Sequence, residues 1–179
     1  MRIFIGIPLS HELKEFLRKM QTEIENNCNR GRFTKSENLH ITLNFLGELN
    51  ESKAGEIEKI IKNIVRKFNG FNIVVKGIGF FENNNKRLYF AKIEQNDKLV
   101  RLQKELSNEL SKIGLYSERR AYKPHITLGR NVELVDGYNT ESMENNCFED
   151  QVKQVTIFES LFLKDGVEYN ELFTERFNN

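Results

Sequence analysis

LHITLNFLGE, residues 39–48, contains a tetrapeptide, H-I-T-L, that occurs again in PHITLGR, residues 124–130. Two of the three histidines of the chain belong to these copies. Successive side chains of an extended strand point to opposite faces, so His40 and Thr42 share one face while the aliphatic residues beside them point the other way. Each copy therefore predicts a strand that buries an aliphatic face and presents an imidazole and a hydroxyl on the other.

The polar faces of the two copies carry the groups that phosphodiester hydrolysis needs. Residues two apart in a strand are separated by about 7 Å, so both side chains can contact one phosphate-sized group. In a shared cleft, one of His40 and His125 can remove a proton from water and the other can protonate the leaving alkoxide, since the ordinary histidine pKa is about 6.5. Thr42 and Thr127 can hydrogen-bond the non-bridging oxygens. The residues alone leave open which histidine is the acid.

A structural role is the alternative to catalysis. A single histidine in a strand is more often structural than catalytic, and duplication of a structural strand would also give two copies. That alternative does not explain why the polar face was retained, and we therefore favour catalysis by His40 and His125. The third histidine, His11, is expected in the first turn of a helix, facing solvent.

Apolar periodicity predicts the other elements of the chain. Helices are expected after the N-cap Ser10, at about residues 51–68, and at about residues 96–114. Further strands are expected at residues 1–7, 71–81, 87–93, 152–163 and 167–177. The polar stretches at residues 26–31 and 131–150 are expected to be loops.

The order of these elements suggests an internal duplication, because each half has a helix followed by an H-I-T-L strand, with hairpin strands nearby. Two copies are too few for a solenoid. We expect an α+β fold with two pseudo-twofold-related lobes of antiparallel strands, with outer helices, around a central cleft. Residues 1–179 are expected to form a single bilobal domain.

Composition excludes several classes of protein. The chain has 27 Lys and Arg against 26 Asp and Glu, a net charge of +1, which argues against a general polyanion binder. No apolar run approaches the roughly 20 residues of a membrane span, and the N-terminus is too short for a signal peptide, so a cytoplasmic location is expected. Cys28 and Cys147 have no metal-ligand spacing. We expect reduced thiols, no metal, no cofactor and a monomer.

The long segments around the repeat resemble those of a known family. RIFIGIPL at residues 2–9, NLHITLNFLGE at residues 38–48 and RAYKPHITLGR at residues 120–130 are similar to segments of the two-histidine phosphoesterase superfamily, and within it of the RNA 2′,3′-cyclic phosphodiesterases, historically called 2′-5′ RNA ligases. The resemblance implies a bilobal α+β fold. It also implies metal-free opening of a 2′,3′-cyclic phosphate at an RNA 3′ end, which leaves a 2′-phosphate.

The resemblance also implies roles for single residues. His40 would protonate the departing ribose O3′ and His125 would activate the attacking water. Thr42 and Thr127 would bind phosphate oxygens, and Arg130 would add a charge-assisted contact.

The predicted position of Arg130 conflicts with this role. Counted from His125, position 130 falls on the opposite face of a regular strand, so Arg130 would point away from the cleft unless a bulge or a strand end at Gly129 turns it back. The alternative is a surface arginine.

Neighbouring residues allow two interpretations each. Arg120 and Lys123 either line the cleft mouth or carry solvated loop charges. Tyr122 and Phe45 either stack on a base or belong to the core.

Three other functions fit the same residues. One is a related reaction, hydrolysis of 2′-5′ oligonucleotides or of small cyclic phosphates. Another is 2′-5′ RNA ligation. The third is a non-catalytic module that binds RNA ends; in that case histidine substitutions weaken binding, but no product forms.

Overall fold

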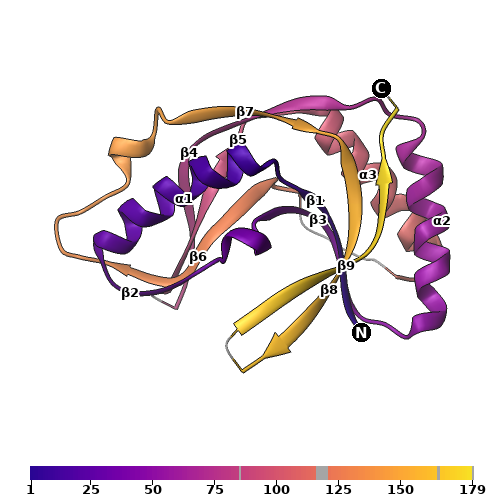
Figure 1. The fold of residues 1–179 in the computed structure, drawn as a ribbon, viewed down its shortest axis with the longest axis horizontal. Coiled ribbons are helices and arrows are strands. Elements are labelled where there is room, and N and C mark those ends of the chain that lie inside the picture. The colour runs from indigo at the N-terminus through magenta and orange to yellow at the C-terminus, as the bar shows by residue number, and fades with distance from the viewer. Residues whose placement is uncertain (85, 116–120, 165, 179) are drawn as a thin grey trace.

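The computed structural model describes residues 1–84, 86–115, 121–164 and 166–178 (Figure 1). Its helices are α1 (His11–Asn26), α2 (Ala54–Val65) and α3 (Asp97–Lys112), with short 3-10 turns at Ser36–Asn38, Glu51–Lys53 and Glu141–Met143. Its strands are β1 (Arg2–Pro8), β2 (Cys28–Phe33), β3 (His40–Glu48), β4 (Phe71–Asn83), β5 (Lys86–Ile93), β6 (His125–Leu134), β7 (Cys147–Val152), β8 (Gln154–Leu163) and β9 (Gly166–Arg176).

The strands form two antiparallel sheets, which confirms the predicted α+β class. A four-stranded sheet has the order β3-β1-β8-β9, and a five-stranded sheet has the order β2-β6-β5-β4-β7. One H-I-T-L copy begins β3 and the other begins β6, so each sheet contains one copy. Each of these strands pairs with a neighbour that carries aromatic residues, β1 in one sheet and β5 in the other.

The chain crosses repeatedly between the two sheets. Helix α1 follows β1 of the four-stranded sheet but packs on β2, β6 and β7 of the five-stranded sheet. Helix α3 follows β5 of the five-stranded sheet but packs on β3 of the other, beside α2 (Figure 1). The two lobes are therefore built from interleaved segments rather than from the N- and C-terminal halves.

The caps and apolar stripes of the helices follow the sequence signals. The Ser10 hydroxyl accepts a hydrogen bond from the backbone of Leu13 at 3.1 Å, and the Asn96 side chain accepts one from Leu99 at 3.0 Å. These bonds satisfy backbone donors that have no partner within the helix. Gly114 follows α3 with a φ of +73°, a conformation that glycine adopts without strain.

The H-I-T-L strands bury their aliphatic faces as predicted. Ile41, Leu43, Ile126 and Leu128 are all at most 3% exposed. They belong to a hydrophobic core that continues through the stripes of all three helices. Burial of four aliphatic side chains at roughly 1.5–3 kcal/mol each fixes which faces of β3 and β6 remain for the polar residues.

Two loop predictions were wrong. Residues 28–31 belong to β2, and the stretch 131–150 contains the end of β6 and the start of β7. Both β2 and β7 are edge strands of the five-stranded sheet, and they leave four and three of their six side chains exposed, so their sequences show little apolar alternation. The expected helix at 51–68 is shorter, because Glu51–Lys53 forms a 3-10 turn and α2 ends at Val65.

Both predicted hairpins pair antiparallel, β4 with β5 and β8 with β9. The turns between them include residues 85 and 165, which lie outside the described residues. Within the described ranges, no helix is long and apolar enough to cross a membrane.

Candidate active site

A cleft of about 700 Å³ is lined by residues of both sheets. All five residues singled out in the sequence line it: His40, Thr42, His125, Thr127 and Arg130. The two H-I-T-L strands therefore present their polar faces to one cavity, although the copies are 85 positions apart in the chain.

The orientation of the His40 ring is set by the hydrogen bonds of its two ring nitrogens. Nδ1 lies 2.7 Å from the carbonyl oxygen of Asn38, which can only accept, so Nδ1 carries the proton. Nε2 lies 2.9 Å from the Thr42 hydroxyl, which donates to it in the neutral ring. The ring packs against Phe4 at 4.7 Å and Tyr169 at 5.1 Å between centroids. His40 thus turns Nε2 toward the threonine of its own motif.

His125 repeats this arrangement in the other sheet. Its Nδ1 lies 2.7 Å from the carbonyl oxygen of Lys123, again two residues earlier, so the proton again occupies Nδ1. The ring contacts Phe81 and Phe90 at 5.3 and 5.2 Å between centroids. Both imidazoles therefore keep Nε2 for chemistry in the cleft.

The two histidines differ in their surroundings. Burial lowers the pKa of His40 to about 4, because the enclosed ring cannot hydrate a charge. The hydrogen bond to Asn38 opposes this shift, and electrostatic repulsion from His125, Arg130 and Lys14 reinforces it. His40 is therefore neutral at pH 7.

A bulge in each strand follows the threonine of the motif. In β3, Thr42 lies opposite Gly6 and Asn44 opposite Ile5, so Leu43 is an extra residue. In β6, Leu128 is the corresponding extra residue between Thr127 and Gly129. An extra residue reverses the alternation of faces beyond it.

The reversal explains the position of Arg130. Arg130 lies five positions after His125 and lines the cleft, as does Phe45, five positions after His40. The bulge lies at Leu128, one residue before the glycine where a bulge was considered. The sequence left the direction of Arg130 open, and the structure turns it into the cleft.

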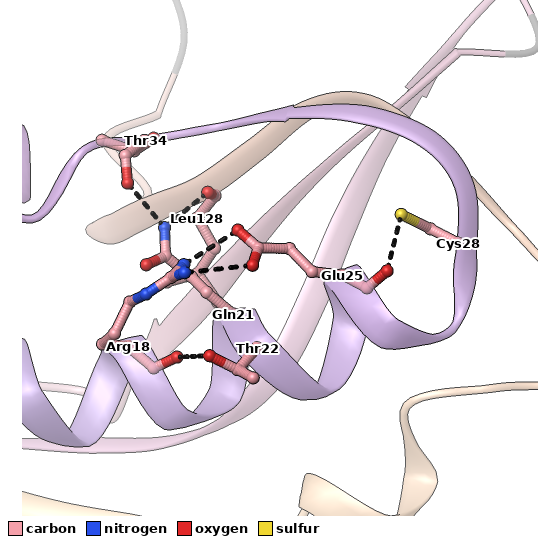
Figure 2. Close-up of polar contacts among 7 residues, drawn as sticks. All are labelled: Arg18, Gln21, Thr22, Glu25, Cys28, Thr34 and Leu128. Carbon is pink, nitrogen blue, oxygen red and sulfur yellow. Dashed lines mark hydrogen bonds and ion pairs between the residues drawn. The ribbon is translucent and has the colours of Figure 1, made fainter.

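In each lobe, a buried glutamine from the helix that covers the sheet donates to the backbone carbonyl of the bulge residue. The Gln21 amide of α1 donates to the carbonyl oxygens of Leu128 and Thr34, both at 2.8 Å (Figure 2). In the other lobe, the Gln103 amide of α3 lies 3.4 Å from the carbonyl oxygen of Leu43. Gln21 thereby ties the bulge before Arg130 to the segment that follows β2.

The cleft lining that sequence reasoning missed includes five polar residues: Arg2, Arg32, Lys35, Asn38 and Tyr169. Arg32 belongs to β2, where residues 28–31 were predicted as a loop, and its cross-strand neighbour is Arg130. Asn38 sits in a turn and donates to the carbonyl of Val167. Among the five, only Asn38 had a visible signal, its position two residues before a motif histidine.

The cleft is strongly cationic. Its described lining includes Arg2, Arg32, Lys35 and Arg130 and no Asp or Glu. Arg32 and Arg130 lie opposite each other, and like charges in that position are destabilising unless an anion lies between them. Burial raises the pKa of the Tyr169 hydroxyl, and the charges of Arg130 and Arg2 oppose that rise. A bound anion would relieve this concentration of positive charge.

The other candidates lie elsewhere. Lys123 is exposed outside the described lining, and the Tyr122 hydroxyl donates to the carbonyl of Thr42 at 3.0 Å. His11 is exposed in the first turn of α1, as predicted. Arg120 lies outside the described residues.

Both cysteines, Cys28 and Cys147, are free thiols. In the described part of the chain, no three His, Cys, Asp or Glu side chains form a group that could hold a metal.

Two antiparallel sheets that each place an H-x-T strand on a shared cleft define the class of two-histidine phosphoesterases. Residues 10–149 match the model of the 2′-5′ RNA ligase superfamily. The chain belongs to this superfamily.

Known proteins similar to the chain agree with this membership. A protein of Thermotoga maritima named RNA 2′,3′-cyclic phosphodiesterase is 32% identical over 99% of this chain and 96% of its own. A protein of the same name from Methanocaldococcus jannaschii is 31% identical over 94% of this chain and 96% of its own. Crystal structures of TT0787 of Thermus thermophilus and of E. coli LigT with 3′-AMP share the fold, with TM-scores of 0.83 and 0.80 at 22% identity. These two structures cover 98% and 99% of this chain and 97% and 98% of their own.

Proposed function

We propose that this protein hydrolyses 2′,3′-cyclic phosphates at RNA 3′ ends and leaves 2′-phosphates. The observation that carries the proposal is the convergence of His40, Thr42, His125 and Thr127 on one cation-lined cleft. The names of the relatives from Thermotoga maritima and Methanocaldococcus jannaschii support the same reaction. General acid–base catalysis by two imidazoles requires no covalent intermediate with the protein.

The proposed reaction is a single displacement at phosphorus. Nε2 of His125 removes a proton from water as the water oxygen forms a bond to phosphorus. The bond between phosphorus and O3′ breaks, and Nε2 of His40 donates a proton to O3′. The hydroxyls of Thr42 and Thr127 and the guanidinium of Arg130 bind the non-bridging oxygens and stabilise their developing charge.

The acid role requires a second proton on His40, whose ring is neutral at pH 7 in the free protein. A bound phosphodiester places a negative charge beside the ring and favours its charged form. The Thr42 hydroxyl, which donates to Nε2 in the free protein, is then released to donate to a phosphate oxygen. Substrate binding would thus create the acid, and the free protein would keep His40 uncharged.

The residues of the cleft also bear on metal use and on domain organisation. The nitrogen donors in the cleft come from two histidines and cations, with no carboxylate among its described lining, which supports catalysis without a metal. The cleft needs residues of both sheets, which supports treating residues 1–179 as one bilobal phosphoesterase domain. We propose a monomer in the cytoplasm, where free thiols such as Cys28 and Cys147 stay reduced.

Substitution of the histidines tests the proposed roles. His40→Ala and His125→Ala should each lower kcat on an RNA ending in a 2′,3′-cyclic phosphate by roughly 100-fold to 10,000-fold. His11→Ala is the matched control, because His11 is exposed on α1 outside the cleft lining, and should keep wild-type turnover. Thermal unfolding of each variant checks that the fold is intact.

The outcomes separate the proposed function from its alternatives. Full activity of either motif variant would contradict the catalytic roles. Binding of the RNA without any product, weakened by both substitutions, would instead indicate a non-catalytic module. Turnover of 2′-5′ oligonucleotides or small cyclic phosphates alone would indicate a related reaction on another substrate, and joined RNA ends would indicate ligation.

A further inference from the structure

Arg2 projects from β1 against two aromatic rings of the cleft. Its guanidinium carbon lies 5.0 Å from the ring centre of Phe45 on β3 and 5.2 Å from that of Phe162 on β8. Contacts of this kind restrain the planar guanidinium while its N–H edges remain able to donate. All three residues belong to the cleft lining.

The guanidinium of Arg2 has no acidic partner in the described part of the chain. Its cross-strand neighbour is Glu48, but the Glu48 carboxylate lies 3.7 Å from the amino group of Met1, and no ion pair joins it to Arg2. By contrast, Arg18, Arg30 and Arg101 on the outer surface each pair with a glutamate. The positive charge of Arg2 is therefore not neutralised by a described carboxylate and can attract an anionic ligand.

The two rings beside Arg2 are unusually open for phenylalanine. Phe45 is 48% exposed and Phe162 is 64% exposed. Isolated exposed apolar residues are common, but these two lie together with the guanidinium of Arg2 in a cleft whose described lining has no carboxylate. The two rings hold the guanidinium in the cleft, where its N–H edges can meet a phosphate of the RNA backbone.

Arg2 is displaced from the place where the reactive phosphate would lie. The ring of Phe4 packs on His40, and Arg2 is two residues before Phe4 in the same strand, a step of about 7 Å. That step is comparable with the separation of successive phosphates along an RNA strand. Arg2 is thus placed for the next phosphate of a chain whose cyclic end contacts His40.

We propose that the guanidinium of Arg2, held against the rings of Phe45 and Phe162, binds the phosphate on the 5′ side of the terminal nucleotide. The proposal rests on the proposed function, and it extends the site by one nucleotide. It makes the protein selective for the ends of RNA chains over free nucleoside 2′,3′-cyclic phosphates.

The test compares two substrates that differ only by the upstream nucleotide. Adenosine 2′,3′-cyclic phosphate is compared with the dinucleotide ApA ending in a 2′,3′-cyclic phosphate, for wild type, Arg2→Gln and Arg2→Lys. Arg101→Gln is the matched control. Arg101 lies on α3, outside the cleft lining, and its guanidinium carbon likewise lies 5.1 Å from the centre of an aromatic ring, that of Phe68. Each variant is first checked for wild-type thermal unfolding.

Wild type should have a higher kcat/KM for the dinucleotide than for the mononucleotide. Arg2→Gln should lower this ratio by roughly tenfold or more, since one charge-assisted contact is lost. The loss should come chiefly from a higher KM for the dinucleotide. Arg2→Lys should retain part of the preference. The slope of log KM against log salt for the dinucleotide should fall by about 0.7 in Arg2→Gln. Arg101→Gln should match wild type in all three respects.

Two results would overturn the proposal. One is an unchanged ratio in Arg2→Gln; the other is a wild type without preference for the dinucleotide. If wild type opens neither substrate, the proposed function has failed, and the Arg2 site is then decided by the Kd of ApA carrying a terminal 3′-phosphate. Equal Kd values for wild type and Arg2→Gln would then count against the site, and a Kd raised roughly tenfold would support it.

Discussion

At the scale of single residues, the two histidines share a geometry but differ in environment. Each donates its Nδ1 proton to the carbonyl two residues earlier, Asn38 for His40 and Lys123 for His125. This common bond selects one tautomer and directs Nε2 to the cleft. Burial lowers the pKa of His40 to about 4, and Tyr169 of β9 packs against its ring.

The lowered pKa of His40 predicts a pH dependence of stability. Above pH 6.5 the ring is neutral in both the folded and unfolded states and contributes nothing. As pH falls from 6.5 to 4, the unfolded chain takes up the proton first, so the free energy of unfolding falls by about 3 kcal/mol. Denaturant unfolding of wild type and His40→Gln from pH 7 to pH 4 should show this difference in slope.

His11→Gln is the control for this titration, since His11 is exposed on α1. It should lose stability on acidification in parallel with wild type. A His40→Gln variant that also follows the wild-type curve would mean that burial does not exclude the proton from the ring.

At the scale of elements, the sequence predicts the helices and most strands well but misses β2 and β7, the two edge strands of the five-stranded sheet. The stripe of α1 and the caps at Ser10 and Asn96 are local signals, and the structure confirms them. Strand β2 is held by backbone bonds to β6 while most of its side chains are exposed, so its sequence shows little apolar alternation. The bulges at Leu43 and Leu128 depend on pairing with distant strands, so spacing within the motif cannot reveal them.

The glutamine of α1 provides a test of the bulge in β6. Gln21→Met keeps the length of the side chain but removes the donor to the carbonyls of Leu128 and Thr34, and it should lower the free energy of unfolding by about 1–3 kcal/mol. It should also lower kcat/KM, because Arg130 would lose its fixed direction. Chemical denaturation and steady-state kinetics measure the two effects.

Gln103→Met is the matched variant in the other sheet. The bond from Gln103 to Leu43 is longer, at 3.4 Å, so its loss should cost less stability than the loss of Gln21. Equal stability of wild type and Gln21→Met would show that the bulge does not need the glutamine.

At the scale of the whole molecule, interleaving of the chain brings the two motifs together. The repeat predicted both the α+β class and a common cleft, because each copy buries one face and leaves the other for function. The cationic residues Arg2, Arg32 and Lys35 come from segments without any repeated pattern, and only long-range strand pairing places them there. The site was thus predictable as far as the two motifs extend, and the cationic residues outside the motifs were not.

The most direct test of the central claim is the position of the phosphate in the product. Purified protein is incubated in EDTA with a short RNA ending in a 2′,3′-cyclic phosphate, and phosphorus NMR identifies the product. We expect the product to carry a 2′-phosphate, since His40 protonates O3′. We expect the rate in EDTA to equal the rate without EDTA, since no metal takes part. A 3′-phosphate, or activity that EDTA abolishes and zinc or manganese restores, would contradict the paired-histidine mechanism.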